Sequence, residues 1–163
     1  MKKKDRSLLF EFLKDSKRSD RELAKVLGVL QPTVTRMRSK LVKEGVIREF
    51  TVIPDFVKMG YEIMAISFFK MRKPLNEPTE NALEWTKKYP NMIFLADGEG
   101  MGKDTVMMSL HENYTEYSKF VTEQRMHWGE NLKDYESMLV SLKGIIAKPL
   151  SLRYLAEEKS LED

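Results

Sequence analysis

The sequence predicts an α+β protein in which a winged helix-turn-helix domain precedes a ferredoxin-like β-α-β-β-α-β domain. Two observations carry this prediction. Apolar residues recur with helical periodicity up to about residue 44, and short apolar strands alternate with helical segments from residue 62 onward. The expected divisions are 1–54 for the first domain, 55–61 for a linker, 62–142 for the second domain and 143–163 for a C-terminal tail.

The segment SDRELAKVLGVLQPTVTRMRSKLVKEGVI, residues 19–47, has the pattern of two helices joined by a tight turn. Ser19 and Glu22 are spaced as a capping box, and Gly28 permits a sharp reversal. The second helix is expected over residues 31–44. The apolar positions expected in a three-helix core are Leu8, Leu9, Phe12 and Leu13 from a first helix over 5–15, followed by Leu23, Val26 and Leu27.

The two faces of this second helix differ in chemistry. Val34, Met37 and Leu41 form one apolar stripe, and polar side chains occupy the opposite side. Short hydroxyls and guanidinium groups suit hydrogen bonds to base edges, whereas lysines suit phosphates. The candidate DNA-binding residues are Gln31, Thr33, Thr35, Arg36, Arg38, Ser39, Lys40 and Lys43. We expect the helix to enter the major groove of double-stranded DNA, with Arg36 at a base and Lys43 at a phosphate.

Charge is distributed unevenly along the chain. Residues 1–60 hold 15 Lys and Arg against 8 Asp and Glu, whereas residues 61–163 hold 13 against 17. A basic first module is expected of a DNA-binding domain attached to a regulatory or assembly domain. The sequence contains no cysteine, which excludes disulfides and thiolate metal sites. The absence of a long apolar run or signal-peptide pattern predicts a cytoplasmic protein that does not associate with membranes.

The remaining elements follow from shorter patterns. We expect a strand over 46–52, either as the wing or as a linking strand. In the second domain, strands are expected over 63–71, 92–96, 104–110 and 135–142, with helices over 78–89 and 114–126. The tail is expected to form a short helix with Leu152, Leu155 and Ala156 inward.

The predicted sheet has more apolar surface than its own helices can cover. Two helices cover one face of a four-stranded sheet, yet 63–71, 92–96 and 106–110 carry apolar residues on both faces. The second face therefore needs a partner, and a second copy of the chain is the simplest one. We expect a homodimer or a higher even-numbered homo-oligomer.

In the order of these pieces the chain resembles the Lrp/AsnC (feast/famine) family of prokaryotic, archaeal-like transcription regulators. The resemblance covers roughly residues 5–142 and is carried by RELAKVLGVLQPTVTRMRSKLVKEGVI, the linker IPDFVKMGY and the β-α-β-β-α-β module. It implies a sequence-specific DNA-binding transcription regulator with a dimerising, ligand-sensing second domain of the RAM type.

The resemblance also implies a small-molecule effector, commonly an amino acid, bound between subunits near residues 97–104. The candidate residues are Gly98, Gly100, Gly102, Lys103 and Asp104, with backbone amides around an anion or carboxylate and Lys103 beside it. A hairpin loop that uses glycine for its positive φ angles explains the same residues. The chain departs from the family here, because Gly98 and Asp104 are six apart, and at Leu30, where members often carry a capping hydroxyl.

Other functions find less support in the residues. Aligned on Gly102-Lys103, a Walker A motif would need glycine at Asp97 and a hydroxyl at Asp104. His111 and His127 lack metal-ligand spacing, so we expect no metal, cofactor or catalytic residue and no enzyme activity. Two alternatives stay open: a sirohaem-decarboxylase-like enzyme, although residues 92–110 contain no Arg, His or Tyr, and an assembly protein of this fold that does not read DNA.

Overall fold

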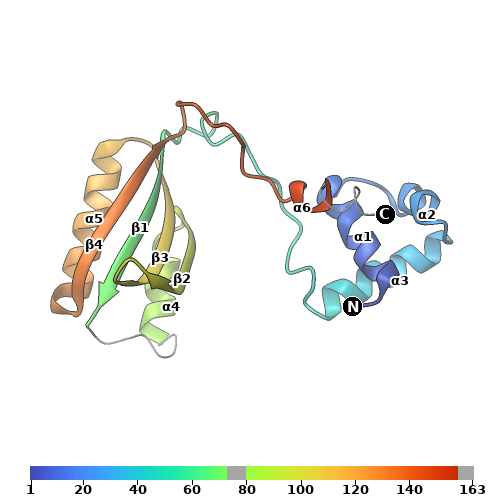
Figure 1. The fold of residues 1–163 in the computed structure, drawn as a ribbon, viewed down its shortest axis with the longest axis horizontal. Helices are drawn as coiled ribbons and strands as arrows, with labels where there is room; N and C mark the ends of the chain where they lie inside the picture. Colours follow the sequence, from blue (N-terminus) through green and yellow to red (C-terminus); the bar gives the residue numbers. More distant parts are fainter. Residues whose placement is uncertain (73–79, 158–163) are drawn as a thin grey trace. The chain divides into compact units, whose positions relative to one another are not determined.

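The computed structural model describes residues 1–72 and 80–157, with the backbone alone for 80–83 (Figure 1). The chain divides into two compact units. The first contains Met1–Ile53 together with the C-terminal segment that begins at Lys148, and the second is Pro54–Ala147. The tail therefore belongs to the first unit, although the whole second unit separates the two in sequence.

Three helices form the first unit, as the periodicity predicts. They are α1 (Lys3–Lys14), α2 (Asp20–Leu27) and α3 (Gln31–Lys43). Their apolar faces meet in one core, in which Ile47 closes the end beyond α3. The buried residues of this core are Leu8, Phe12, Leu23, Ala24, Val34, Leu41 and Ile47, with Leu9, Leu27, Val29 and Met37 packed against them.

The ends of α2 and α3 show how the turn is built. The predicted capping box is confirmed, because the Ser19 side chain accepts from the backbone N–H of Glu22 while the Glu22 carboxylate accepts from the Ser19 backbone at 2.8 Å. Gly28 ends α2 in the left-handed region, at φ 62°. Leu30 precedes α3 without a side-chain cap, as its apolar side chain predicts.

One core prediction in α2 is wrong. Val26 is 58% exposed, and Ala24 is buried in its place. The buried arc of α2 is centred on Leu23, Ala24 and Leu27, and Val26 lies about 100° away from that centre around the helix.

The strand predicted over 46–52 is not formed, since residues 46–53 contain neither helix nor strand. Phe50 instead packs edge-to-face on Phe12, with ring centroids 5.7 Å apart. A single extended segment does not make a β-ladder by itself, because its backbone groups need a neighbouring strand.

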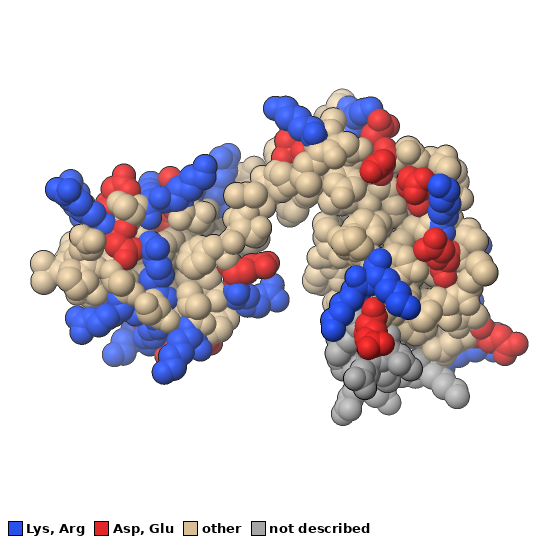
Figure 2. All heavy atoms as spheres, turned by 180° about the vertical axis from the view of Figure 1, so that it is seen from behind, with Lys and Arg blue, Asp and Glu red and all other residues tan. Residues whose placement is uncertain are grey.

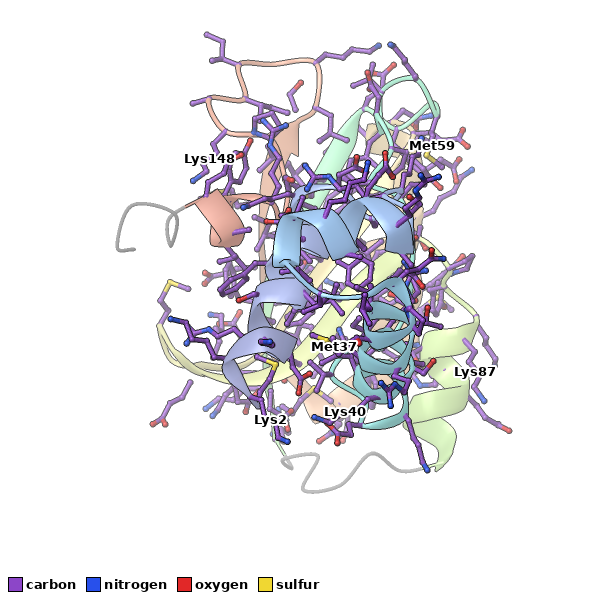
Figure 3. All side chains as sticks on the ribbon, turned by 90° about the vertical axis from the view of Figure 1, so that its right-hand side faces the viewer. Lys2, Met37, Lys40, Met59, Lys87 and Lys148 are labelled. Atoms are coloured by element: carbon purple, nitrogen blue, oxygen red, sulfur yellow. The ribbon has the colours of Figure 1, made fainter. Side chains whose placement is uncertain are left out.

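The tail forms the short helix α6 (Tyr154–Glu157), which packs on α1. Ala156 is buried as predicted, whereas Leu152 and Leu155 are exposed, contrary to the prediction. The ammonium of Lys148 lies 4.3 Å from the Tyr154 ring centroid, and Figure 3 shows this lysine beside α6.

The second unit has the predicted β-α-β-β-α-β order. Its strands are β1 (Ile63–Met71), β2 (Met92–Gly100), β3 (Lys103–His111) and β4 (Leu132–Ser141). Its helices are α4 (Glu80–Lys87) and α5 (Tyr114–Trp128), with a short 3-10 turn, η1 (Gly129–Asn131), before β4. The four strands pair antiparallel in the order β2-β3-β1-β4, and α4 and α5 lie on one face of the sheet (Figure 1).

The two faces of this sheet differ in cover. Phe69, Met107 and Tyr135 point toward α5 and form the core with Phe120. Strand alternation and the pairing register place a second set on the other face: Met64, Ile66, Phe68, Phe94, Val106, Met108, Met138 and Val140. Within the described chain no helix covers these residues, and Phe94 and Met138 are 49% and 64% exposed. We call this set the open sheet face.

Candidate nucleic-acid interface

The exposed surface of α3 carries part of the predicted DNA-binding set. Thr35, Arg36, Ser39 and Lys43 are exposed, as is Gln31 at the helix start, while Thr33 is half-buried. In the described residues, neither Arg36 nor Lys43 has an acidic partner within 4 Å. Both cations are therefore available to a ligand outside the protein.

Asp20, the first residue of α2, holds α3 in place. Its carboxylate accepts a hydrogen bond from the Thr35 hydroxyl at 2.7 Å and pairs with the Arg38 guanidinium at 2.5 Å. Arg38 also lies over the Phe12 ring, 4.9 Å from its centroid. Arg38 is thus engaged inside the unit, and its predicted contact with DNA stays a prediction. Its periodic position lies closer to the core than that of Arg36.

Lys40 also has a partner within the unit. Its ammonium donates to the buried carboxylate of Asp5 on α1 at 2.5 Å, and Figure 3 shows Lys40 at the edge of the helical unit. The hydrogen bond from Lys40 lowers the pKa of Asp5, and the same bond raises the pKa of Lys40. Lys40 therefore ties α3 to α1, and its predicted contact with DNA stays a prediction.

The structure adds cations that the helix pattern did not single out. Arg21 and Lys25 are exposed on α2 and form no ion pair within the described residues. Figure 2 shows lysine and arginine side chains gathered over the first unit. In a helix-turn-helix the first helix of the pair crosses the phosphate backbone, so α2 cations suit that contact. In the sequence, the Arg and Lys of RELAK are the residues from which this phosphate contact could have been predicted.

The glycine-rich segment 97–104 is a hairpin and not an open loop. Strand β2 continues to Gly100, which pairs with Lys103, so the turn contains only Met101 and Gly102. Both have positive φ, 51° and 72°, as a tight two-residue hairpin requires. The segment therefore forms the hairpin with positive φ angles, and the effector site at these residues stays a prediction.

Both charged residues of the predicted effector site are engaged within the unit. Lys103 reaches across β1 to β4, where it pairs with Asp134 and, at 3.0 Å, with Glu136. The hydrogen bond to Asp134 raises the pKa of Lys103. Asp104 accepts from the backbone of Met71 at 3.1 Å and pairs with Lys70. In one copy of the chain, Lys103 is not free to hold an anion.

The described residues contain no group of three or more His, Asp or Glu side chains placed to hold a metal ion. None of their helices is long and apolar enough to span a membrane.

Comparisons with known proteins agree with the class that the helices define. Residues 1–48 match a family model described as winged helix-turn-helix DNA-binding. The HTH-type transcriptional regulator PF1231 of Pyrococcus furiosus is 39% identical over 62 residues, which span 42% of that protein. A longer match, 31% identical over 117 residues, covers 72% of this chain and 76% of the HTH-type transcriptional regulator PH1692 of Pyrococcus horikoshii.

Solved structures share the whole architecture. An AsnC family transcriptional regulator from Agrobacterium tumefaciens superposes with a TM-score of 0.74 at 20% identity, over 95% of this chain and 99% of that one. The regulator NMB0573 from Neisseria meningitidis, solved as an L-Met complex, gives 0.74 at 17% identity over the same shares. At these identities the structures show the fold alone.

The fold and the exposed α3 define a DNA-binding protein of the winged helix-turn-helix class. The sequence matches place it further: the chain belongs to the family of HTH-type transcriptional regulators that includes PH1692, and it has the fold of AsnC family regulators. The comparisons do not favour the alternative of a sirohaem-decarboxylase-like enzyme, because the relatives are named as transcription regulators.

Alanine substitutions of the two neighbouring arginines of α3 should differ in their effect on the stability of the protein. Arg38→Ala loses the pair with Asp20 and the packing on Phe12, so the free energy of unfolding should fall by about 1–2 kcal/mol. Arg36→Ala, the matched control, should change it by less than about 0.5 kcal/mol. Urea unfolding followed by far-ultraviolet circular dichroism measures both, since the first unit is mainly helical. Equal losses in the two variants would contradict this division of roles.

Proposed function

We propose that α3 lies in the major groove and reads sequence through its exposed face, as part of a cytoplasmic transcription regulator. The observation that carries the proposal is Arg36, an exposed guanidinium without an acidic partner in the described chain, flanked by the hydroxyls of Thr35 and Ser39. A guanidinium fits the paired acceptors of guanine, and short hydroxyls hydrogen-bond to base edges. Gln31 and Thr33 stand at the helix start, the part that enters the groove first in this class.

We expect the cations around the exposed face of α3 to contact phosphates and not bases. Lys43 at the end of α3, with Arg21 and Lys25 on α2, would neutralise phosphates and fix the orientation of the helix. Thr35 is already fixed by its bond to Asp20, so its hydroxyl oxygen keeps an acceptor position for the DNA. A symmetric dimer would read a roughly palindromic site, with half-sites one helical turn or a multiple of it apart.

Fluorescence anisotropy tests this proposal on two duplexes, the DNA upstream of the gene and a shuffled control. Wild type should prefer the upstream duplex, and Arg36→Ala should lose about 1–3 kcal/mol of that preference. Lys43→Ala should weaken binding to both duplexes and reduce the slope against salt. Equal weak binding to both duplexes would leave a non-specific DNA binder. No binding at low salt would instead favour the assembly protein that does not read DNA.

We also propose that the open sheet face joins two copies of the chain. It groups apolar side chains from all four strands, and Phe94 and Met138 remain largely exposed in a single copy. Isolated proteins rarely leave contiguous apolar surface of this kind in water. A second copy is the partner with matching chemistry, since a two-fold axis places the same patch on both sides.

Met138→Asp tests this dimer. Placing a carboxylate in an apolar interface should shift the protein from dimer to monomer at micromolar concentration, because the charge loses its hydration when the interface forms. Ser141→Asp is the control, since Ser141 is exposed and belongs to the opposite set of β4 positions. Analytical ultracentrifugation gives the masses. If wild type is a monomer, or if Met138→Asp leaves the dimer intact, the open sheet face is not the dimer interface.

We propose in addition that the second domain responds to a small-molecule effector such as an amino acid. The support is the L-Met complex of NMB0573, a protein of the same fold. Because Lys103 is held by Asp134 and Glu136, we expect the hairpin 98–104 to offer backbone amides to a carboxylate and not the Lys103 ammonium.

Adding L-methionine to the DNA complex tests the effector proposal. An effector should change the DNA affinity of wild type, and Lys103→Met should keep that response. D-methionine is the matched control for simple ionic effects. A response to L-methionine that Lys103→Met abolishes would restore Lys103 as the anchor, and identical effects of both enantiomers would argue against a site.

A further inference from the structure

One apolar side chain at the start of α3 faces solvent. Leu30, the residue before the helix, is 76% exposed, the largest exposed fraction of any large apolar side chain that the structure describes in the first unit. Gln31 and Pro32, which follow it, are exposed as well, whereas Val29 before it packs against the core. Leu30 therefore lies outside the core, at the end of α3 that we propose to enter the groove first.

The backbone around Leu30 is held by hydrogen bonds on both sides. The Val29 N–H donates to the Ala24 carbonyl of α2 at 3.0 Å. The Leu30 carbonyl accepts from the N–H groups of Thr33 and Val34, at 2.9 and 3.3 Å, in the first turn of α3. These bonds fix where the Leu30 side chain leaves the backbone, so a contact with it does not first have to order the turn.

Leucine is a poor residue for this position. Leu30 is the N-cap of α3 and makes no side-chain cap hydrogen bond, whereas a serine there would stabilise the helix start by about 1 kcal/mol. One exposed leucine is ordinary by itself. Here a second apolar side chain, Val26 of α2, is 58% exposed on the other side of the turn at Gly28. Two exposed apolar side chains thus flank the turn that joins α2 and α3.

The charges around this turn indicate the chemistry of the partner. Arg21 and Lys25 precede the turn on α2 and Arg36 follows it on α3, and within the described residues none of them forms an ion pair. A partner for this surface is therefore negatively charged and yet offers an apolar group to Leu30. The major groove of DNA has both properties, because phosphates border it and each thymine displays a 5-methyl group in it.

We propose that Leu30 contacts the 5-methyl group of a thymine and makes the protein prefer sites with thymine at that position. This inference rests on the proposed DNA recognition by α3 and adds one base to it. In helix-turn-helix proteins the first residues of the second helix reach base edges. Apolar side chains recognise thymine there through its methyl group. The contact needs no hydrogen bond, so it is independent of the contact proposed for Arg36.

Replacing thymine by uracil tests this contact, because uracil lacks only the methyl group. The site is one that wild type selects from a pool of random duplexes, prepared once with thymine and once with deoxyuridine at every thymine. Fluorescence anisotropy gives both affinities. Wild type should bind the uracil duplex about fourfold more weakly for each methyl group that Leu30 contacts.

Leu30→Ser should remove this preference. The variant should bind the two duplexes equally, and its melting temperature should not fall, because the hydroxyl can cap α3. Leu155→Ser is the matched control, since Leu155 is 55% exposed on α6, which packs on α1. It should keep the thymine preference of wild type. Arg36→Ala should bind more weakly and keep the same ratio of affinities.

The outcomes separate this contact from DNA recognition as a whole. Equal binding of wild type to the two duplexes would overturn the contact and leave recognition standing, as would a thymine preference that survives in Leu30→Ser. If wild type enriches no sequence from the pool, the proposed function fails and the contact with it. A changed mass of Leu30→Ser in analytical ultracentrifugation would instead place Leu30 between protein copies, which also overturns the proposal.

Discussion

The carboxylate of Asp20 connects the two helices on which DNA recognition depends. It stands at the first residue of α2, where a negative charge also suits the helix N-terminus. From there it binds Thr35 and Arg38, two positions of α3 that are three residues apart and therefore neighbours on one side of the helix. These two bonds fix the rotation of α3 about its axis. Arg36 and Ser39 are presented outward as a consequence, while Val34 and Leu41 enter the core.

Lys40 completes this arrangement from the other side. Its bond to Asp5 joins α3 to α1, so two ion pairs and one apolar stripe hold the recognition helix against both neighbours. The polar residues of α3 therefore form two groups. Arg38 and Lys40 neutralise buried or half-buried carboxylates of the same unit, and Arg36 and Lys43 carry charge that the unit leaves unbalanced. The second group forms the basic surface that we propose for DNA recognition.

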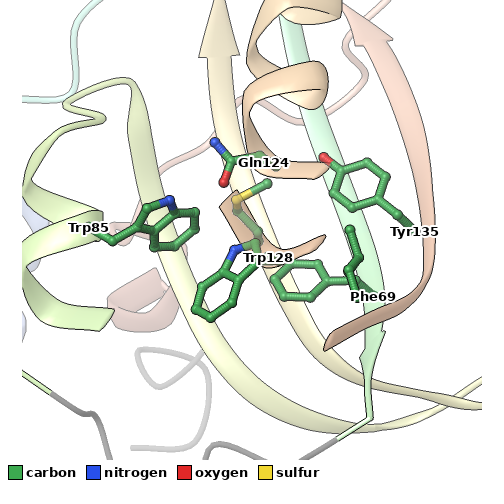
Figure 4. Close-up of a pocket in the computed structure, with 7 residues that line it drawn as sticks. Phe69, Trp85, Gln124, Trp128 and Tyr135 are labelled. Atoms are coloured by element: carbon green, nitrogen blue, oxygen red, sulfur yellow. The ribbon is translucent and has the colours of Figure 1, made fainter. Parts of the chain in front are cut away.

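The second unit uses polar groups in a different manner on each face of its sheet. The open sheet face is apolar and ends in an ionic cluster, where Lys103, Asp134 and Glu136 meet beside the hairpin. On the helix-covered face the buried hydroxyl of Ser67 forms hydrogen bonds with the half-buried hydroxyls of Ser137 and Tyr135. The Gln124 amide lies among the rings of Phe69, Trp85 and Trp128 in the same core (Figure 4).

The sequence by itself determined the features that depend only on residues close together in the chain. The Ser19–Glu22 capping box, the turn at Gly28, the apolar stripe of α3 and the β-α-β-β-α-β order all follow from neighbouring residues and their periodicity. The tertiary structure decided what depends on distant partners. It assigned Arg38 to Asp20, Lys40 to Asp5 and Lys103 to Asp134, and it left 46–52 without a strand partner. It also brought Ala156 back to α1. The physical reason is the same in each case: the chemistry of a long cationic side chain or a short strand allows several partners, and only the three-dimensional fold selects one.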